Sequence, residues 1–324
     1  MTVEAKQNSR AGRDRAQSSG TLTLHTMAGR GHIDLATRCL SSIVKYYDQP
    51  IHVVVHDDGT SRPEDVERFQ EKVPASSFIL KRDADLVVND FMARYPACRK
   101  LRNNLVYGLK IFDIQILEEG PELSYTDCDI LFVRPVSRFF RLPDDPSAGG
   151  VFMKDPRQAY CLTPWQLMRN RKLHLADRLN GGLLHFRRAA FDWDLVEWFL
   201  KHDDYVIHPY WKEQTAWSAL AAATRSWFWD EKQVRVIKSR DELTPQVAVA
   251  HYVSSYRQFM EYAPADGHED ERPVVVPIFP FKECTGARFV ADHARRFARG
   301  AKKRVASFAG HQRRRRHAEP SFPG

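Results

Sequence analysis

Strand-like and helix-like segments alternate along most of this 324-residue sequence, an order that few folds accommodate. Residues 21–27 (TLTLHTM) alternate in polarity as a β-strand does, and residues 33–47 carry apolar side chains at helical spacing. Residues 51–60 (IHVVVHDDGT) form a second strand that ends in a turn, and a short helix follows at 64–72. Strands and helices in this order build a mostly parallel sheet covered on both faces. We therefore expect an α/β fold in which helices flank a mixed, mostly parallel sheet in a single domain.

The rest of the chain continues this alternation. A long helix is expected over residues 100–119, ended by Gly120-Pro121, and a strand interrupted by acids is expected over 123–133. Further strands are expected at 77–80, 151–153, 182–186 and 247–253, and further helices at 191–202 and 211–224. In such a sheet the active residues collect at the carboxyl ends of the strands.

The sharpest chemical signal is Asp127-Cys128-Asp129, which is flanked by apolar residues on both sides. Two carboxylates two positions apart on a strand point to the same face, where like charges repel each other. Burying them in so apolar a segment is costly without a partner, and a divalent cation supplies one. Hard oxygen ligands select Mg²⁺ or Mn²⁺. A pair of acids in a surface turn is the alternative interpretation.

A second signal is His251, at the end of the strand-like segment VAVAHYV. Imidazole is a common metal ligand, so His251 is a candidate third ligand beside the two aspartates. Arg257 follows six residues later, and its guanidinium suits an oxygen of a diphosphate. A core or surface histidine beside Tyr252 is the alternative for His251.

Two weaker signals follow the aspartate pair. Asn180-Gly181-Gly182 precedes a strand, and glycines there allow a close approach of the backbone to a ligand or simply form a turn. Glu213-Gln214 stands near the start of an apolar helix. These polar groups either cap the helix or face a pocket, where they would bond to sugar hydroxyls.

These four signals, in this order, resemble the GT-A nucleotide-sugar glycosyltransferases over roughly residues 21–265. The layout is most similar to the retaining galactosyltransferase and glycogenin-like branch. That branch has a strand ending in Asp-x-Asp, an Asn-x-Gly segment, an Asp/Glu-Gln helix start and a late motif His-Phe-x-Gly-x-x-Lys-Pro-Trp. Here the late motif has His251 and, six residues on, Arg257 in the place of Lys. Ser254 stands in the place of Gly, and Gln258-Phe259 in the place of Pro-Trp.

The resemblance implies a Rossmann-like GT-A domain and a metal-dependent hexosyl transfer from a nucleotide-diphosphate sugar. The donor would be a uridine diphosphate sugar, the acceptor a glycan or a lipid-linked glycan, and the anomeric configuration would be retained. Mn²⁺ or Mg²⁺ would be bound by Asp127, Asp129 and His251. The catalytic centre around the transferred sugar would hold Asn180, Glu213 and Gln214. The donor-binding residues would be His25, Thr26, Asp57, Asp58, Lys100, Arg102 and Arg257, although a solvated helix start equally explains Lys100 and Arg102.

The net charge of +8 is unevenly distributed. Residues 285–324 hold eleven Lys or Arg against two acids, whereas residues 21–284 hold 34 basic and 37 acidic residues. We expect a disordered leader at 1–20, the glycosyltransferase domain at 21–284, and a basic amphipathic or disordered tail at 285–324. Because the folded part lacks a basic stripe, no specific nucleic-acid partner is expected. The tail would lie on an anionic membrane surface or pack on the domain and continue into solvent.

Cysteine usage and hydropathy bear on the compartment. The five cysteines are odd in number and lack Cys-x-x-Cys spacing, so neither a disulfide framework nor a structural zinc site is expected. The first twenty residues lack the apolar stretch of a secretory signal, and no apolar run approaches about 18 residues. We expect a cytoplasmic, bacterial-type enzyme that is peripheral on the inner face of the membrane.

Two other function classes compete with the transferase. One is an Asp-x-Asp phosphatase, whose motif usually stands near the N-terminus and ends in Thr or Val, where this chain has Leu131. The other is a non-catalytic anion-binding protein that uses the arginine run at 313–316 to bind nucleic acid or acidic lipid.

Overall fold

The computed structural model describes residues 20–202, 208–263, 272–295 and 298. The strands are β1 (Leu22–Ala28), β2 (Ile51–Asp57), β3 (Ser76–Ile79), β4 (Glu122–Thr126), β5 (Ile130–Phe132), β6 (Gly150–Lys154), β7 (Leu179–Arg187), β8 (Trp227–Trp229), β9 (Val234–Val236), β10 (Val249–His251) and β11 (Ile278–Pro280). The α-helices of the described residues include α2 (Ile33–Tyr46), α3 (Pro63–Lys72), α4 (Lys81–Phe91), α5 (Pro96–Asn104), α6 (Val106–Leu117), α7 (Pro164–Arg169), α8 (Trp193–Leu200) and α9 (Lys212–Ala223). A further helical stretch, called here the C-terminal helix, covers 286–295.

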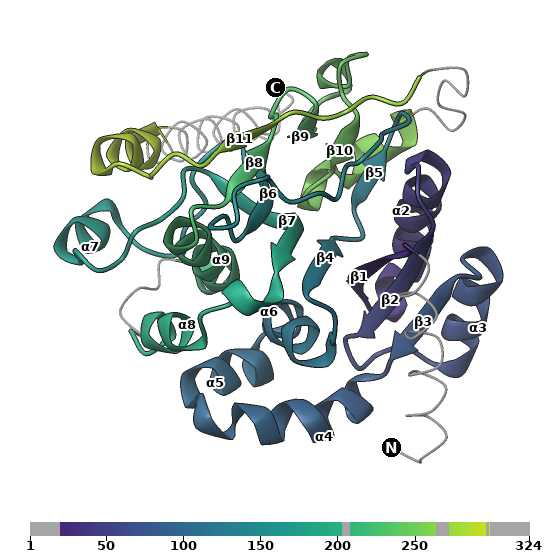
Figure 1. Cartoon of the computed structure of the whole chain (residues 1–324), viewed down its shortest axis with the longest axis horizontal. Helices are drawn as coiled ribbons and strands as arrows, with labels where there is room; N and C mark the ends of the chain where they lie inside the picture. The colour runs from purple at the N-terminus through teal and green to yellow at the C-terminus, as the bar shows by residue number, and fades with distance from the viewer. Residues whose placement is uncertain (1–19, 203–207, 264–271, 296–297, 299–324) are drawn as a thin grey trace, which may run out of the picture.

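The strands form two sheets. The larger has eight strands in the order β11-β8-β6-β7-β4-β1-β2-β3, and the smaller has three in the order β5-β10-β9 (Figure 1). Strands β1, β2, β3 and β4 pair in parallel, whereas β7 is antiparallel to both of its neighbours. The expected α/β fold with a mixed, mostly parallel sheet flanked by helices is confirmed.

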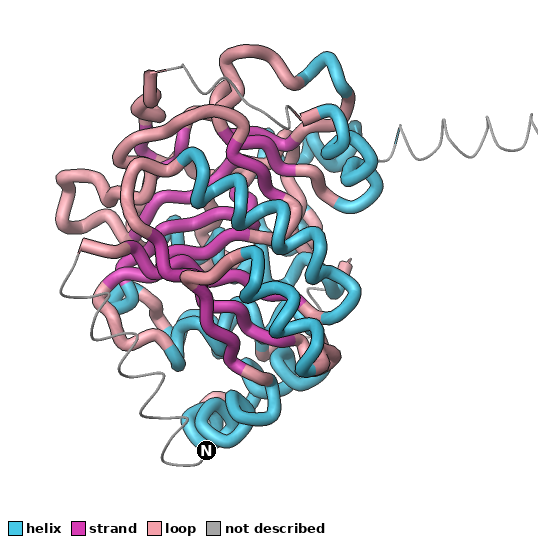
Figure 2. The backbone as a smooth tube through the Cα atoms, turned by 90° about the vertical axis from the view of Figure 1, so that its right-hand side faces the viewer, coloured by secondary structure: helices cyan, strands magenta, loops and turns pink. Residues whose placement is uncertain are grey.

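Alternate residues of the central strands serve two different cores. On β6, Phe152 belongs to a cluster with α5, α6, α8 and α9, while its neighbours Val151 and Met153 belong to a cluster with α2. On β7, Leu184 and Leu183 divide in the same way. Because successive strand side chains point to opposite faces, a continuous apolar run is what a sheet buried on both faces requires. The helices therefore lie on both sides of the larger sheet (Figure 2).

The expected strand at 123–133 is two strands in two sheets. β4 ends at Thr126 in the larger sheet, and β5 begins at Ile130 in the smaller one. The sequence predicted a strand interrupted by acids, and in the structure the chain passes from the first sheet to the second at this interruption. The segment from Asp127 to Asp129 is therefore a connection between sheets, not part of a ladder.

The expected helix at 100–119 is also divided. Leu105 has extended backbone angles and separates α5 from α6. Gly108 makes the close packing of the two helices possible, since a Cβ there would lie 2.4 Å from the Cα of Arg102. The glycine is the local sequence signal for this break, because Gly is the least favourable residue after Pro in a helix interior.

Residues 278–295 pack on the domain. β11 pairs with β8, the amide of Cys284 donates to the carbonyl of Leu175, and Phe289 of the C-terminal helix is fully buried against Tyr160. Part of the segment assigned to a basic tail thus contributes to the core. The leader at 1–19 and the arginine run at 313–316 lie outside the described residues.

Two further sequence expectations concern thiols and membrane spans. All five cysteines are buried and free of disulfide bonds, as expected from their odd number and spacing. Among the helices that the structure describes, none combines the length and the apolar character needed to cross a bilayer.

Candidate active site

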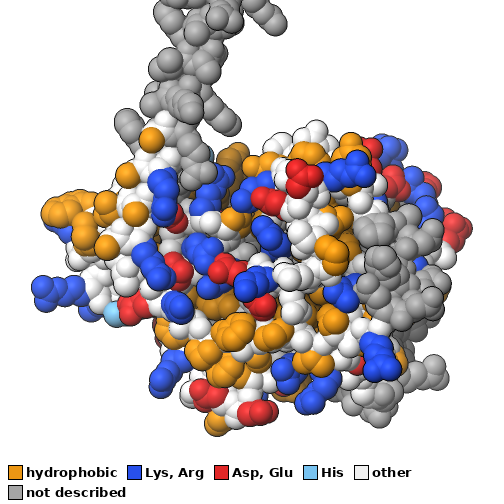
Figure 3. Space-filling view, turned by 90° about the horizontal axis from the view of Figure 1, so that it is seen from above, with side chains coloured by type: hydrophobic (Ala, Val, Ile, Leu, Met, Phe, Trp, Pro, Cys, Tyr) orange, Lys and Arg blue, Asp and Glu red, His pale blue; other side chains and the backbone are white. Residues whose placement is uncertain are grey.

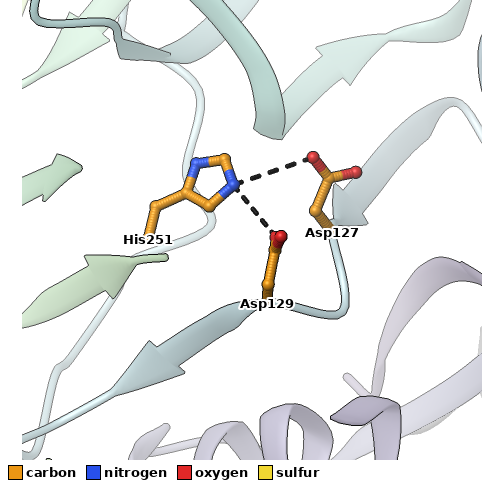
Figure 4. A group of neighbouring side chains, drawn as sticks. All are labelled: Asp127, Asp129 and His251. Carbon is orange, nitrogen blue, oxygen red and sulfur yellow. Dashed lines mark hydrogen bonds and ion pairs between the residues drawn. The ribbon is translucent and has the colours of Figure 1, made fainter. Parts of the chain in front are cut away.

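Asp127, Asp129 and His251 meet where the chain passes from the larger sheet to the smaller one. Asp127 directly follows β4, Asp129 directly precedes β5, and His251 ends β10, which pairs with β5. Each side chain offers a ligand atom, and these atoms all lie within 4.8 Å of one another (Figure 4). His251 Nε2 is 3.0 Å from Asp129 Oδ1 and 3.9 Å from Asp127 Oδ2. The sequence prediction that these three residues converge across 122 positions holds in the structure.

Gly182 on β7 leaves the space that this cluster occupies. A Cβ at this position would lie 2.5 Å from His251 Cε1 and 2.8 Å from both Asp127 Oδ2 and Asn180 Oδ1. The carbonyl of Gly182 also accepts a 2.6 Å hydrogen bond from the amide of Asp127. The missing Cβ thus brings this backbone close to the side chains of the cluster, and its close approach to a ligand stays a prediction.

The carboxylate of Asp129 is almost fully buried and has two basic partners. Arg257 donates through Nε at 2.9 Å and Nη2 at 2.8 Å to Asp129 Oδ2, while His251 contacts Oδ1. Burial alone would raise the pKa of Asp129, but His251 and Arg257 outweigh it and lower the pKa to about 2. Asp129 is therefore ionised at neutral pH, as a metal ligand must be.

Lys110 is one residue of this candidate site that sequence reasoning missed. It lies in α6, is buried, and places Nζ 3.0 Å from Asp127 Oδ1 and 3.5 Å from Glu213 Oε1. Burial alone would lower its pKa, but Asp127 and Glu213 raise it above the usual value. Nζ also lies 5.0 Å from the centre of the Tyr125 ring, whose hydroxyl donates to Asp127. A charged lysine thus bridges two acids of the candidate site.

Glu213 and Gln214 stand in the first turn of α9. Glu213 is buried, and its burial raises the pKa of the carboxyl group although Lys110 opposes the rise. A Cβ at Gly181 would lie 2.9 Å from Glu213 Oε1, so this glycine also makes room for a site carboxylate. Gln214 Nε2 donates to the carbonyl of Ala159 at 3.2 Å. Glu213 therefore joins the cluster through Lys110, whereas Gln214 bonds to the backbone beside it.

Asn180 connects the cluster to Asp155. Its Nδ2 donates to Asp155 Oδ2 at 3.1 Å, and its Oδ1 accepts from the amide of Gly182 at 2.8 Å. Burial raises the pKa of Asp155, although hydrogen bonds from the Arg157 amide and from Asn180 oppose this. The side chain of Asn180 is thus fixed at the edge of the cluster.

His25 and Thr26 on β1 are buried within the fold. His25 Nε2 lies 2.7 Å from Glu118 Oε2 and Nδ1 lies 2.9 Å from His56 Nε2. The Thr26 hydroxyl donates to the carbonyl of Thr126 at 2.8 Å. At 2% and 0% exposure neither residue presents a surface to a ligand in this structure.

Asp57 and Asp58 follow β2 at the carboxyl edge of the sheet. Asp57 is buried and accepts from the amide of Ser61. Asp58 lies beside the loop after β1, since a Cβ at Gly29 would overlap its carboxylate. These two residues occupy the sheet edge where a nucleotide was expected, and their contact with one stays a prediction.

Lys100 and Arg102 differ from each other in their surroundings. Lys100 is exposed on α5, whereas the Arg102 guanidinium is fully buried. Arg102 contacts Asp113 through Nε at 2.6 Å and Nη2 at 2.7 Å, and Asp85 through Nη1 at 2.6 Å. This network joins α4, α5 and α6 and leaves no exposed guanidinium surface for a donor. Neither the donor role nor the alternative of a solvated helix start fits Arg102.

Tyr107 is a second residue that the sequence did not single out. It is 43% exposed at the start of α6 and packs edge-on against Tyr210, with ring centres 6.2 Å apart. Tyr107 precedes Lys110 by three residues on α6, and burial, followed by the charge of Asp127, raises the pKa of its hydroxyl. Tyr107 and Tyr210 together form an exposed aromatic rim beside the site.

No family model matches the chain, and no curated protein matches it in sequence. The solved structures that resemble it include the galactosyltransferase LgtC with donor and acceptor sugar analogs, at 12% identity over 75% of this chain and 95% of that chain, with a TM-score of 0.46. Mouse xyloside xylosyltransferase 1 has 14% identity, coverages of 71% and 97%, and a TM-score of 0.43. The glycosyltransferase GlyE of Streptococcus pneumoniae has 12% identity, coverages of 76% and 61%, and a TM-score of 0.48. At these TM-scores the likeness carries no weight for what this chain binds.

Proposed function

We propose that this chain is a metal-dependent glycosyltransferase that moves a sugar from a nucleotide-diphosphate donor to a glycan or lipid-linked acceptor. The observation that carries the proposal is the convergence of Asp127, Asp129 and His251 at the carboxyl edge of the sheet. Two carboxylates and an imidazole form a donor set suited to Mn²⁺ or Mg²⁺. The surrounding Lys110 and Arg257 add the positive charge that a diphosphate leaving group needs.

The residues present fit a divalent cation. Neighbouring ligands of an octahedral ion bound at about 2.1 Å lie about 3 Å apart, and His251 Nε2 lies 3.0 Å from Asp129 Oδ1. The space beside them exists only because Gly182 has no side chain. When bound, the cation would neutralise the diphosphate and stabilise charge on the leaving group.

The other charged residues hold the reacting groups in place. Lys110 fixes Asp127 and Glu213 and contributes a buried positive charge beside the metal ligands. Arg257 contacts Asp129 while its side chain is 41% exposed, and this exposure supports the proposal that it would bind a diphosphate oxygen. Glu213, Gln214 and Asn180 surround the place where the transferred sugar would lie, and their roles there are part of the proposal.

We further propose a uridine diphosphate sugar as donor and retention of the anomeric configuration. The support for retention is that each carboxylate of the site already has an ion pair or a hydrogen bond. Among the described residues, Glu213 is tied to Lys110, Asp155 to Asn180, and both aspartates of the cluster to basic groups. An inverting enzyme needs a carboxylate that can take a proton from the acceptor. Nuclear magnetic resonance of the fresh product would identify the anomer, and an inverted product would contradict this part.

The proposals for the acceptor and for the cellular location rest on exposed aromatic surface and on charge. The exposed rim of Tyr107 and Tyr210 offers aromatic surface for a sugar ring beside the cluster. A basic C-terminal segment would bring the protein to an anionic membrane carrying a lipid-linked acceptor, which fits a peripheral enzyme on the cytoplasmic side. Liposome sedimentation of the full chain, with and without acidic lipid, tests this location.

The proposed activity is tested with the variant Asp129→Asn. Hydrolysis of uridine diphosphate sugars in the presence of Mn²⁺ should fall by about 100-fold or more, because even groups that only support a metal ligand contribute about 10- to 100-fold. Calorimetry should show a matching loss of Mn²⁺ affinity.

The matched control is Asp144→Asn, which changes an exposed aspartate outside the site. Circular dichroism establishes that both variants fold. Equal Mn²⁺ affinity and equal donor hydrolysis in the two variants would remove the metal site from the mechanism. A wild-type protein that hydrolyses phosphate monoesters and no nucleotide sugar would support the phosphatase alternative.

A further inference from the structure

A cavity opens at the same edge of the larger sheet as the metal-ligand cluster. It has a volume of about 550 Å³ and lies between the end of β6, the residues before β7 and the C-terminal helix. Lys154 at the end of β6 pairs with Leu179 at the start of β7, which places the cavity beside Asn180. Figure 3 looks onto the face where Lys and Arg side chains gather around the base of the C-terminal helix. The cavity walls include Lys154, Arg157, Asp177, Arg178, Glu231, Lys282, Arg288, Asp292 and Arg295.

The cavity has more positive than negative charge. Six of its lining residues are Lys or Arg and three are Asp or Glu. Each acid already has an arginine partner: Glu231 pairs with Arg178 at 2.8 Å, Asp177 with Arg288 at 3.3 Å, and Asp292 with Arg295 at 2.6 Å. The remaining cations are Lys154, Arg157 and Lys282, and the described part of the chain gives none of them an ion pair within 4.0 Å. Three positive charges therefore line the cavity without an ion pair of their own among the described residues.

Two observations indicate that this convergence is imposed by the fold. Burial lowers the pKa of the half-buried Lys154, and the charges of Arg178 and Lys282 lower it further despite Glu231. Arg178 has a left-handed backbone with φ of 56°, a conformation that a bulky residue rarely adopts. It is held there by Gln158 Oε1, which accepts from its amide at 3.0 Å, and by its carbonyl, which accepts from Asp155 at 2.6 Å. Strained backbone of this kind is concentrated at ligand sites.

A short chain of contacts joins the cavity to the candidate active site. Arg178 contacts Asp155 through the backbone, Asp155 accepts from Asn180, and Asn180 accepts from Gly182 beside Asp127. A group bound by Lys154 and Lys282 would therefore lie next to the residues that surround the transferred sugar. Arg257, which the proposed function gives to the donor diphosphate, contacts Asp129 and is not among the described residues that line this cavity, so the cavity is left to the acceptor.

We propose that this cavity binds the phosphate or pyrophosphate group of the acceptor, so that the enzyme prefers an acceptor carrying such an anion. The anion would complete the charge of Lys154, Arg157 and Lys282, and its attachment would place the acceptor glycan toward Asn180. This inference rests on the proposed glycosyl transfer for the identity of the ligand as an acceptor. The anion site itself does not depend on that activity.

The anion site is tested first by calorimetry on the full chain, with inorganic pyrophosphate as the probe and no metal or nucleotide present. The variant is Lys154→Gln/Arg157→Gln/Lys282→Gln, and the matched control is Lys72→Gln/Arg99→Gln/Lys172→Gln, three exposed cations outside the cavity. Loss of three charge-assisted contacts should weaken pyrophosphate binding by about tenfold or more in the cavity variant. The control should bind as the wild type does. Equal affinity in the two variants would overturn the site.

The source of the anion is tested by transfer rates. Two acceptors are compared, one carrying a sugar diphosphate on a short lipid and one carrying the same sugar without phosphate. We expect a lower KM for the diphosphate acceptor in the wild type and no such preference in the cavity variant. Pyrophosphate binding without any acceptor preference would mean that the ligand is free phosphate, and the acceptor assignment would be wrong. Absence of all transfer together with normal pyrophosphate binding would refute the glycosyltransferase assignment and leave the anion site standing.

Discussion

Gly182→Ala is the smallest change that should separate the candidate site from the rest of the fold. The added Cβ would lie 2.5 Å from His251 Cε1 and 2.8 Å from an oxygen of Asp127. Ordinary contact begins at 3.4 Å, so His251 must move by about 0.9 Å and Asp127 by about 0.6 Å. Overpacking of this size costs about 1–3 kcal/mol of stability, and a misplacement near 1 Å costs about 100-fold in rate. The predicted effect is thus a folded protein with a damaged site.

The matched control is Gly31→Ala, where an added Cβ meets nothing within 4 Å. Urea denaturation, Mn²⁺ calorimetry and donor hydrolysis are measured on both variants and the wild type. We expect Gly182→Ala to remain folded at 25 °C while its Mn²⁺ affinity falls by about 10- to 100-fold. If Gly182→Ala binds Mn²⁺ and hydrolyses the donor as Gly31→Ala does, then the space left by the missing side chain of Gly182 is not needed for a metal site.

Two other variants test charges that the fold has buried. Lys110→Met leaves Asp127 and Glu213 without their shared cation, so the metal-free protein should lose about 3–5 kcal/mol of stability in urea denaturation. Added Mn²⁺ should restore more stability to the variant than to the wild type. Equal stability of the two proteins without metal would contradict the role of Lys110 between the two acids. Glu197 accepts from the amides of Ala97 and Cys98 at the start of α5, and these bonds outweigh burial and lower its pKa. A lowered pKa gives stability that is present above the ordinary glutamate value and lost as pH falls through the folded value. The free energy of unfolding of the wild type, measured by urea denaturation, should therefore exceed that of Glu197→Gln by about 1–2 kcal/mol at pH 7. This difference should shrink below about pH 4, and a difference that does not depend on pH would refute the prediction.

The parts of the fold that sequence predicted well depend on local pattern. Strands β1 and β2 and helix α2 follow the expected segments closely, because apolar periodicity determines which face of an element can be buried. The candidate metal ligands were also accessible from sequence, since two close acids in an apolar segment need a compensating charge wherever the chain leads. The division of residues 123–133 between two sheets was not accessible in this way. Both halves are apolar and strand-like, and only the pairing of β5 with β10 shows that the second half belongs to the smaller sheet.

Basic residues on helices show the limit of sequence most clearly. Lys100, Arg102 and Lys110 lie within one expected helix, yet one is exposed, one joins three helices and one bridges site acids. Their chemistry is similar, and the difference lies in partners brought by α4 and α9. Gly108 was the available signal that the helix divides and changes which face is buried. Without that division, no periodicity argument could assign Lys110 to the site.

The charges around the cluster also suggest the order in which ligands bind. Three carboxylates, of Asp127, Asp129 and Glu213, face two cations, of Lys110 and Arg257, so the site has a net charge of −1 when His251 is neutral. A nucleoside diphosphate approaching this site alone would meet repulsion from Asp127, whose side chain is 28% exposed. A divalent cation changes the net charge to +1 and makes the same site attractive to a diphosphate. Arg257 can then exchange its contact with Asp129 for one with the diphosphate, because Asp129 has gained the metal as a partner. Nucleotide affinity should therefore depend on prior metal binding, as a consequence of charges that the apoprotein already holds in place.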